Sequence, residues 1–549
     1  MVIITIIGEF DKSFLRRGIV NISFMTIPAS DGVQLSSLIV LPAEDGPFPV
    51  IITRTPYDKM QFVEAAKGWA SAGFAFVAQD VRGRHGSGGR WIPYDHEEAD
   101  GLSTLRWVLA QDWCNGQIAL EGSSYGAFAA YAAAQGDGSA LASSLITLVP
   151  AMGLHETAFH PSGAFHLLDR LWWEASFGSS KVNEQDRFWN MYERCPDAIW
   201  HLPVRDLPLA FPMELPHWQR ATEPEAEQET IRLADIRSPV MHIGGWHDAF
   251  TGALLRNYRI LSERADPRPQ SLIIGPWTHE VNQPPRYPSR SYGPNTRLPL
   301  ARMEMNWLRH TLQGEALRYP SVLIYAMGAN RWIAPPAWPL PGTITKSFYL
   351  AGTGMRLQEQ TPKEEEQPSH YRYDPANPLP AREYPSFRQD LDARSDVLCY
   401  TSDALNEDLL VAGTAYVHLW VSSSSSQTDF YACLSEVDPS GNVIYITSGL
   451  ARSTSAAAPE PINEQSIEIP LKPVCQLLPR GSRIRISISS SCFPEYDRSL
   501  NTIGDSLRQS AFVQADQTIW HDAARPSQFI LPCHDDALER WYYDNQTSL

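Results

Sequence analysis

Ser124, Asp248 and His279 are residue types that together perform nucleophilic catalysis, and they follow one another in that order along the chain. Ser124 lies at the centre of Gly122-Ser123-Ser124-Tyr125-Gly126, which has the Gly-x-Ser-x-Gly spacing of a nucleophile elbow. A serine hydroxyl attacks a carbonyl carbon well only when a base removes its proton, and a histidine serves best when a carboxylate holds its tautomer. The three side chains therefore predict acyl transfer by a Ser-His-Asp triad.

Each of these residues directly follows a segment that has the character of a buried strand. Residues 117–120, 238–244 and 271–275 are strand-like apolar runs, and the small residues 127–134 after the serine predict a tightly packed helix. The carboxyl ends of parallel strands meet at one edge of a sheet, where ligands bind. We therefore expect the three side chains to meet there, in the order serine, acid, histidine that α/β-hydrolases use.

Simpler roles remain open for two of the three residues at this point. Asp248 precedes Ala249-Phe250 and could cap the helix that follows, and His279 could be an ordinary loop histidine. His247 is a rival base beside the acid, but that choice would leave the end of the last strand without a role.

Alternating strand-like and helix-like segments predict an α/β fold with a mostly parallel sheet covered on both faces. The alternation runs through residues 18–155 and resumes over residues 236–315, so we assign both stretches to one α/β-hydrolase domain. Residues 156–235 are rich in tryptophan, histidine and proline and are expected to form an inserted helical cap. Short strands with polar turns in residues 316–549 predict a C-terminal all-β jelly roll.

The bulk composition argues against several other classes of protein. A net charge of −17 argues against nucleic acid and anionic membranes as partners, because both require basic patches. The seven cysteines form no Cys-x-x-Cys pair, so neither a disulfide framework nor a zinc site is expected, and a reducing, cytoplasmic location is the default. Residues 1–7 are apolar, but acidic residues follow too early for a signal peptide or a membrane span.

No metal and no organic cofactor is implied by the sequence. The histidines show no His-Glu-x-x-His or comparable spacing, and the glycine-rich residues 80–89 lack both the dinucleotide and the Walker patterns. The expected partner is a small-molecule ester or acyl substrate, and self-association through the flat surface of the jelly roll is a further expectation.

Eight short stretches, spread over nearly the whole chain, form a combination far more specific than any one of them. They are Arg54-Thr55-Pro56-Tyr57, Gln79-Asp80-Val81-Arg82-Gly83, Gly122-Ser123-Ser124-Tyr125, Gly245-Trp246-His247-Asp248, Gly275-Pro276-Trp277-Thr278-His279, Thr428-Asp429-Phe430, Val437-Asp438-Pro439 and Ser448-Gly449-Leu450-Ala451-Arg452. In this combination the chain resembles the cocaine esterase and X-prolyl dipeptidyl-peptidase family of serine hydrolases, which also contains the α-amino-acid ester hydrolases. The resemblance implies an α/β-hydrolase domain, a helical cap and a C-terminal jelly roll.

The resemblance also implies residue roles. In this family the tyrosine of the Arg-Thr-Pro-Tyr stretch donates to the oxyanion, so the Tyr57 hydroxyl is expected to do so together with the backbone N–H of Tyr125. The triad would then form an acyl-enzyme that water cleaves. Ala127 departs from the family, which usually has a second glycine there, while Gly126 keeps the spacing of the elbow.

The residues that follow Asp248 help to show which members of the family the chain resembles most. Amino-acid ester hydrolases bind the ammonium of their substrate through a carboxylate cluster, with two members shortly after the acid, whereas this chain has Phe250 and Thr251 there. Glu156, early in the cap, could still contact an amine, or could simply face solvent.

We therefore expect an ester hydrolase similar to the cocaine esterases. Trp172 or Trp173 would pack against a neutral, partly aromatic acyl group, and Phe250 and Trp277 are further candidates for contact with the substrate. Two alternatives stay open. One is acyl transfer, or cleavage of an amide, an X-prolyl bond or an amino-acid ester, by the same triad. The other is a binding protein whose hydrolase domain is vestigial.

Overall fold

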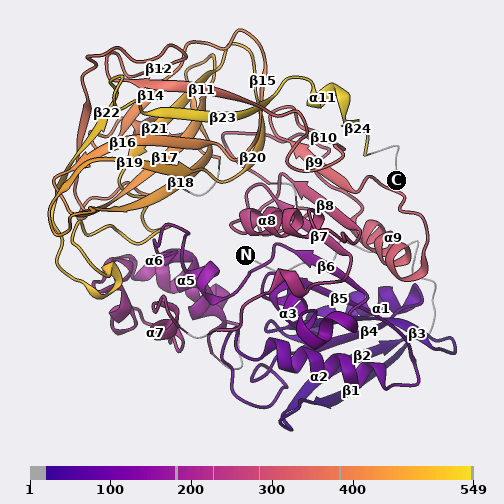
Figure 1. Cartoon of the computed structure of the whole chain (residues 1–549). Coiled ribbons are helices and arrows are strands. Elements are labelled where there is room, and N and C mark those ends of the chain that lie inside the picture. Colours follow the sequence, from indigo (N-terminus) through magenta and orange to yellow (C-terminus); the bar gives the residue numbers. More distant parts are fainter. Residues whose placement is uncertain (1–19, 180–182, 227, 284, 383–384, 546–549) are drawn as a thin grey trace.

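The computed structural model describes residues 20–179, 183–226, 228–283, 285–382 and 385–545, so the apolar run at residues 1–7 lies outside it. Figure 1 shows an α/β domain on the right, a helical cap at the lower left and a β-rich domain at the upper left. This arrangement confirms the fold class expected from the sequence. Within the described ranges, no helix combines the length and the apolar character needed to cross a bilayer.

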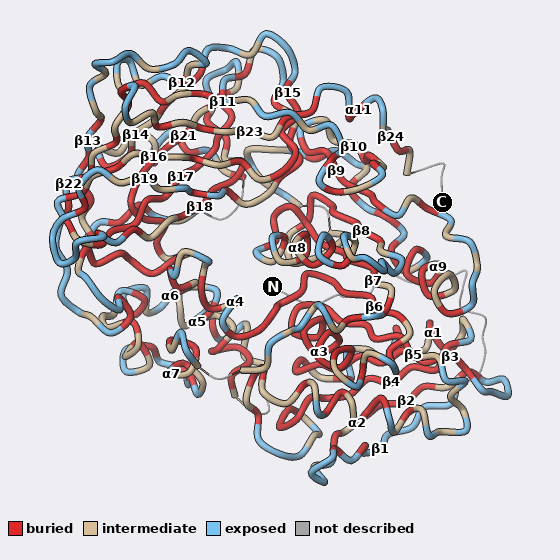
Figure 2. The backbone as a smooth tube through the Cα atoms, viewed as in Figure 1, coloured by how far each residue is buried: buried red, intermediate tan, exposed pale blue. Residues whose placement is uncertain are grey.

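An eleven-stranded sheet forms the centre of the α/β domain. Its strands, in spatial order, are β1 (Asn21–Pro28), β2 (Gln34–Leu41), β4 (Ala75–Asp80), β3 (Phe48–Thr55), β5 (Cys114–Ser123), β6 (Ser144–Leu148), β7 (Val240–Gly245), β8 (Gln270–Gly275), β9 (Val322–Ala326), β10 (Arg331–Ile333) and β24 (Tyr542–Tyr543). Neighbouring strands from β4 to β9 are parallel and largely buried (Figure 2). Their carboxyl ends therefore meet at one edge of the sheet.

Helices cover both faces of this sheet. They are α1 (Val63–Ser71), α2 (Glu97–Leu109), α3 (Tyr125–Ala133), α8 (Thr251–Ser262) and α9 (Leu300–Gln313). Successive residues of a strand point to opposite faces. Accordingly, Ala119 of β5 shares an apolar core with α1 and α9, whereas its neighbour Leu120 shares another with α2 and α3.

The cap is inserted between β6 and β7. Its helices are α4 (Leu154–Ala158), α5 (Leu167–Phe177), α6 (Gln185–Arg194) and α7 (Trp218–Ala221). A small core of its own, which includes Phe165, Leu171 and the fully buried Trp218, holds these helices together. Helix α5 carries Trp172 and Trp173, the two tryptophans that the sequence places near the substrate.

The C-terminal domain is a predominantly antiparallel β-structure, as the sequence predicts. Its strands are β11 (Ile344–Ala351), β12 (Arg356–Gln358), β13 (Ser369–Tyr373), β14 (Leu398–Thr401), β15 (Leu409–Gly413), β16 (Tyr416–Ser423), β17 (Gln427–Val437), β18 (Val443–Thr454), β19 (Ile462–Pro470), β20 (Val474–Leu478), β21 (Arg483–Ser489), β22 (Ala515–Trp520) and β23 (Gln528–His534), with short helices α10 (Gln389–Asp392) and α11 (Ala537–Arg540). Residues of β16 alternate between half-buried and buried, the pattern of a strand with one face on a core.

The domain boundary expected at residue 316 is wrong in one respect. Strands β9 and β10 lie after it, yet they extend the sheet of the α/β domain, because Ile273 of β8 pairs with Leu323 of β9. Near the C-terminus, Trp332 of β10 pairs with Tyr543 of β24, so the chain returns to the α/β domain after completing the jelly roll. A short apolar run does not indicate which of two adjoining sheets it joins.

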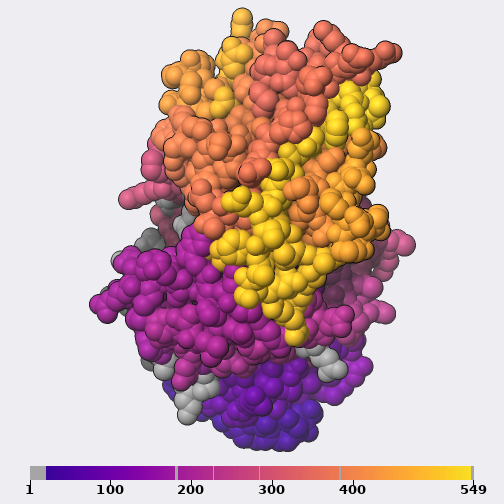
Figure 3. Space-filling model, turned by 90° about the vertical axis from the view of Figure 1, so that its left-hand side faces the viewer, coloured from indigo at the N-terminus to yellow at the C-terminus, as the bar shows by residue number. Residues whose placement is uncertain are grey.

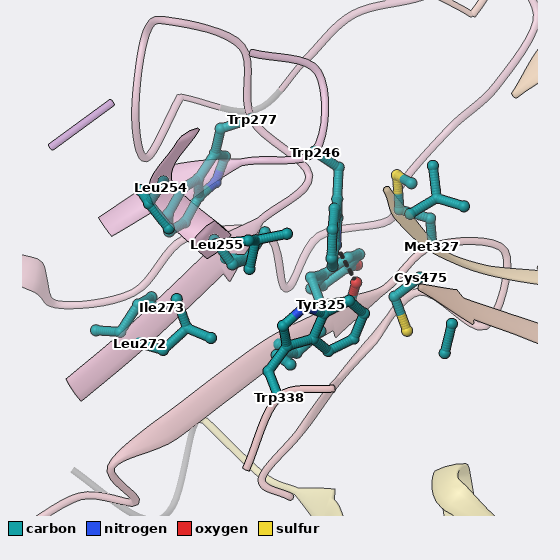
Figure 4. Close-up of a cluster of buried hydrophobic side chains, with 14 of the residues drawn as sticks. Trp246, Leu254, Leu255, Leu272, Ile273, Trp277, Tyr325, Met327, Trp338 and Cys475 are labelled. Atoms are coloured by element: carbon teal, nitrogen blue, oxygen red, sulfur yellow. Dashed lines mark hydrogen bonds between the residues drawn. The ribbon is translucent and has the colours of Figure 1, made fainter. Parts of the chain in front are cut away.

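An apolar junction around β9 joins the two domains (Figure 4). The indole N–H of Trp246 donates to the carbonyl oxygen of Tyr325 at 2.8 Å. The Met327 N–H donates to the carbonyl oxygen of Cys475 at 2.9 Å, and the Met327 carbonyl oxygen accepts the Leu477 N–H at 2.7 Å. The catalytic sheet and the jelly roll are therefore joined by backbone hydrogen bonds and a common core.

The jelly roll also holds the start of α5. Just before the helix, the Phe165 N–H donates to the Asp497 carboxylate at 2.7 Å. In the first turn, the Leu167 N–H donates to the carbonyl oxygen of Glu495 at 3.1 Å, and the Leu168 N–H donates to that of Pro494 at 3.0 Å. The first N–H groups of a helix have no partner within the helix, so the jelly-roll loop supplies partners that α5 lacks. Figure 3 shows C-terminal residues, in yellow, lying against the cap.

Two carboxyl groups are buried near the strand that carries the nucleophile elbow. Glu121 lies on β5 and Glu304 on α9. Burial raises the pKa of both above the ordinary 4.5, and the charge of Glu304 raises that of Glu121 further. The stability that they contribute is therefore complete below pH 4.5 and is lost as the pH rises through the raised pKa values.

Replacing Glu121 with Gln keeps the shape of the side chain and removes its titration. We expect the melting temperature of E121Q, relative to the wild type, to rise by about 2 °C or more between roughly pH 5.5 and pH 8.5, because only the wild type carries a carboxyl that is ionised in the unfolded chain and must be protonated on folding. Differential scanning fluorimetry measures this difference, with Glu64→Gln on the surface as the control. If the melting temperatures of E121Q and the wild type changed with pH in the same way, the prediction would be contradicted.

Candidate active site

The turn from β5 into α3 holds Ser124 in an unusual backbone conformation, with φ of 55° and ψ of −121°. A serine rarely adopts a positive φ, so the surrounding structure must hold it there. Gly122 makes the turn possible, because a Cβ at that position would lie 2.1 Å from the carbonyl oxygen of Gly126. Ala127 is fully buried in α3, so the elbow accommodates the departure from the family pattern.

Asp248 and His279, which follow β7 and β8, meet at the same edge of the sheet. His279 Nδ1 lies 2.6 Å from Asp248 Oδ2. The other carboxylate oxygen of Asp248 accepts the Phe250 N–H at 2.8 Å, just before α8 begins. Asp248 therefore closes the turn before α8 and orients the imidazole at once, because an ionised carboxylate has two accepting oxygens.

Opposing influences act on the charge of His279. Burial lowers its pKa, but the charge and the hydrogen bond of Asp248 outweigh burial, so the pKa of His279 rises above the ordinary 6.5. The side chain remains 28% exposed, which leaves part of the ring open to a substrate.

His247, the rival base, is part of the core. Its Nε2 lies 2.7 Å from the hydroxyl of Tyr292, and its ring packs edge-on against Tyr287. Burial lowers the pKa of His247 to about 3, so this ring is neutral. The histidine bonded to the Asp248 carboxylate is His279.

Tyr57 lies just after β3 and points its hydroxyl at the serine. The Tyr57 hydroxyl lies 3.5 Å from Ser124 Oγ, and it accepts the indole N–H of Trp173 at 3.5 Å. Burial raises the pKa of Tyr57, so its hydroxyl keeps its proton. Tyr125 is the first residue of α3, and the N–H of such a residue has no partner within its helix. Both expected oxyanion donors therefore lie beside the serine.

Aromatic rings form a wall next to these donors. The ring of Trp173 stacks on that of Tyr125, with centroids 6.2 Å apart and planes at 14°, and it also stacks on Tyr94. Trp172 packs edge-on against Phe177, whose ring also contacts Tyr57. This wall is the apolar surface nearest to the Tyr57 hydroxyl.

The two expected contacts at Phe250 and Glu156 have different surroundings. The ring of Phe250 meets that of His279 edge-on, with centroids 5.7 Å apart, so it lies at the site. Glu156 instead forms an ion pair with Arg256 of α8 at 2.8 Å. Its charge is thus already balanced by a neighbouring side chain.

Trp277 is not available to a substrate, which corrects the sequence-based expectation. Its side chain is fully buried, and its indole N–H donates to the carbonyl oxygen of Thr296 at 2.8 Å. Figure 4 shows it within the apolar cluster on Leu254. A tryptophan two residues before His279 can point into either the site or the core, and the sequence does not tell which.

An ionic network beneath Tyr125 was not foreseen from the sequence. Glu97, at the start of α2, accepts the Tyr125 hydroxyl at 2.9 Å and lies 2.9 Å from the guanidinium of Arg54. The carboxylate of Glu229, from the end of the cap, accepts the Glu97 N–H at 2.7 Å. Acidic residues are common in the first turn of any helix, so Glu97 carried no distinguishing signal.

Comparisons with known proteins match both halves of the chain. The profile of the X-Pro dipeptidyl-peptidase (S15 family) matches residues 31–280, and that of the X-Pro dipeptidyl-peptidase C-terminal non-catalytic domain matches residues 315–530. The chain belongs to the X-Pro dipeptidyl-peptidase family. This S15 chain is 29% identical to the cocaine esterase of Rhodococcus sp. (strain MB1 Bresler), over 93% of this chain and 98% of that protein.

Two solved structures share the fold over nearly the whole S15 chain. An aminopeptidase from Thaumarchaeota archaeon superposes with a TM-score of 0.79 at 20% identity, covering 96% of this chain and 98% of that one. An α-amino acid ester hydrolase superposes with a TM-score of 0.76 at 22% identity, covering 97% of this chain and 99% of that one. These two likenesses show the fold. With the family match and the esterase relative, the protein is a serine hydrolase of carboxylic esters.

The raised pKa of His279 predicts the acid limb of the activity profile. We expect kcat/KM for a simple ester to fall in acid with a midpoint above pH 6.5, because the imidazole must be neutral to accept a proton. Asp248→Asn should move that midpoint to lower pH and reduce kcat by about 10³–10⁴-fold. Measurements of kcat/KM against pH with a sensitive fluorogenic ester test both effects. An unchanged midpoint in D248N would mean that a group other than His279 causes the loss of activity in acid.

Proposed function

We propose that the protein hydrolyses a small-molecule carboxylic ester through an acyl-enzyme on Ser124. The observation that carries this proposal is the 2.6 Å contact between Asp248 and His279 at the sheet edge that bears the elbow serine. Ser124 Oγ attacks the ester carbonyl carbon while His279 takes its proton. The imidazolium, held by Asp248, gives this proton to the departing alkoxide, so that an alcohol leaves. Water then attacks the acyl-enzyme, with His279 again as base.

The proposed oxyanion donors are the Tyr57 hydroxyl and the Tyr125 N–H. Two features support the pair: the protonated phenol 3.5 Å from Ser124 Oγ, and the position of Tyr125 at the start of a helix, where the dipole favours negative charge. Donors aimed at the developing oxyanion stabilise the transition state more than the ester, so they accelerate the chemical step.

The proposed acyl group is neutral and partly aromatic. The half-buried Trp173 offers an aromatic surface beside the Tyr57 hydroxyl, with the buried ring of Tyr94 stacked behind it, and an aromatic acyl group gains from such a surface. Glu156 would have to leave Arg256 before it could bind a substrate ammonium, which speaks against an amino ester. The relative named cocaine esterase is in keeping with an ester substrate.

Hydrolysis of a panel of substrates by the wild type and by Ser124→Ala tests this function. The panel holds p-nitrophenyl acetate, butyrate and benzoate, phenylglycine methyl ester and an X-Pro p-nitroanilide. We expect cleavage of the simple esters that is lost in S124A, because only the acyl-enzyme route uses this hydroxyl. Preference for the amino ester or the anilide would overturn the assigned acyl group, and product analysis with added amines separates hydrolysis from acyl transfer.

Tyr57→Phe tests the oxyanion hole separately. The variant keeps the ring and loses the donor, so we expect kcat to fall by about 10²–10³-fold with little change in KM. S124A supplies the background rate. A Y57F enzyme that turns over at the wild-type rate would remove this hydroxyl from the mechanism.

A further inference from the structure

A buried ion pair lies beneath the two proposed oxyanion donors. The Arg54 guanidinium and the Glu97 carboxylate approach to 2.9 Å, and neither side chain is more than 3% exposed. Arg54 Nη1 also donates to the Glu97 carbonyl oxygen at 2.8 Å, and Arg54 Nε donates to the side chain of Gln79 at 2.9 Å. These contacts, on separate guanidinium nitrogens, fix the plane of this side chain.

The other oxygen of the Glu97 carboxylate holds Tyr125. The Tyr125 hydroxyl donates to Glu97 Oε1 at 2.9 Å and accepts the Tyr94 N–H at 2.9 Å. The Tyr125 side chain is fully buried, so both hydrogen bonds are made away from water. The ring of Tyr125 is thus anchored at its far end, while its backbone N–H lies beside Ser124.

The same ion pair reaches the strand that carries the other donor. Arg54 belongs to β3, and Tyr57 lies two residues beyond the end of that strand. The backbone of Arg54 also borders the elbow, because its carbonyl oxygen would lie 3.3 Å from a Cβ placed at Gly126. One arginine therefore contacts the elbow through its backbone and Glu97 through its side chain.

We propose that Arg54 and Glu97 are positioning residues of the ester-cleaving centre. Their ion pair fixes the spacing between the Tyr57 hydroxyl and the Tyr125 N–H, a role that rests on the oxyanion hole proposed above. Neither residue reaches the substrate. A buried ion pair seldom adds stability over well-packed apolar residues, because desolvation offsets its attraction. The geometry that this pair imposes is the better account of its presence.

Tyr125→Phe is the most direct test, because it removes one oxygen atom and leaves the backbone donor in place. Glu97→Gln keeps an accepting oxygen for Tyr125 and removes the charge that holds Arg54. Tyr131→Phe is the matched control: Tyr131 lies on the same helix, is fully buried, and has its hydroxyl 3.3 Å from that of Thr147. Each variant is assayed with p-nitrophenyl acetate and for inhibition by an aryl trifluoromethyl ketone, whose adduct with the serine carries an oxyanion.

We expect Y125F and E97Q to lower kcat about tenfold with KM within about twofold, because small misplacements of donors cost rate rather than binding. Both should weaken inhibition by the ketone by a similar factor, while Y131F changes neither quantity. Rates and inhibition in Y125F that equal those in Y131F would overturn the positioning role, even if Y57F and S124A behave as proposed. Full turnover by S124A would overturn the proposed function itself.

Discussion

The close contact between Gly122 and Gly126 fixes the direction in which α3 leaves the sheet. A Cβ at Gly122 would come within 2.1 Å of the Gly126 carbonyl oxygen, so no other residue fits without moving strand or helix. This approach forces the positive φ of Ser124 and places the first N–H of α3 beside its hydroxyl. The Ser124 hydroxyl and the Tyr125 N–H are therefore set by the same backbone constraint, and the side chains of Asp248, His279 and Tyr57 must be brought to them.

The surrounding elements do this in two ways. The parallel sheet delivers Asp248 and His279 at the ends of neighbouring strands, where a single carboxylate closes the turn before α8 and orients the imidazole. The cap contributes from outside the sheet, because α5 brings Trp173 within reach of the Tyr57 hydroxyl. Several charged side chains are buried around this edge; Glu97 is paired with Arg54, and burial raises the pKa of Glu121.

Much of this architecture could be predicted from the sequence, because it rests on local signals. The Gly-x-Ser-x-Gly spacing predicted the sharp turn at Ser124, and the apolar runs placed Ser124, Asp248 and His279 just beyond strand ends. Trp277 and β9 were misjudged because apolar segments and tryptophans carry no mark of the surface against which they pack. Glu97 was missed because its partner Arg54 lies far away in sequence, and only the tertiary fold brings the two together.

The hydrogen bonds between the jelly roll and the start of α5 bear on how members of such a family diverge. Phe165 and Leu167 of the cap depend on Asp497 and Glu495 of the C-terminal domain. A chimaera with the cap of one relative and the jelly roll of another is expected to lose these hydrogen bonds. A chimaera that takes both regions from the same relative is expected to keep them. The cap and the loop around residue 495 are thus one packed unit, and a change in that loop would be felt first at the start of α5, the helix that carries Trp173.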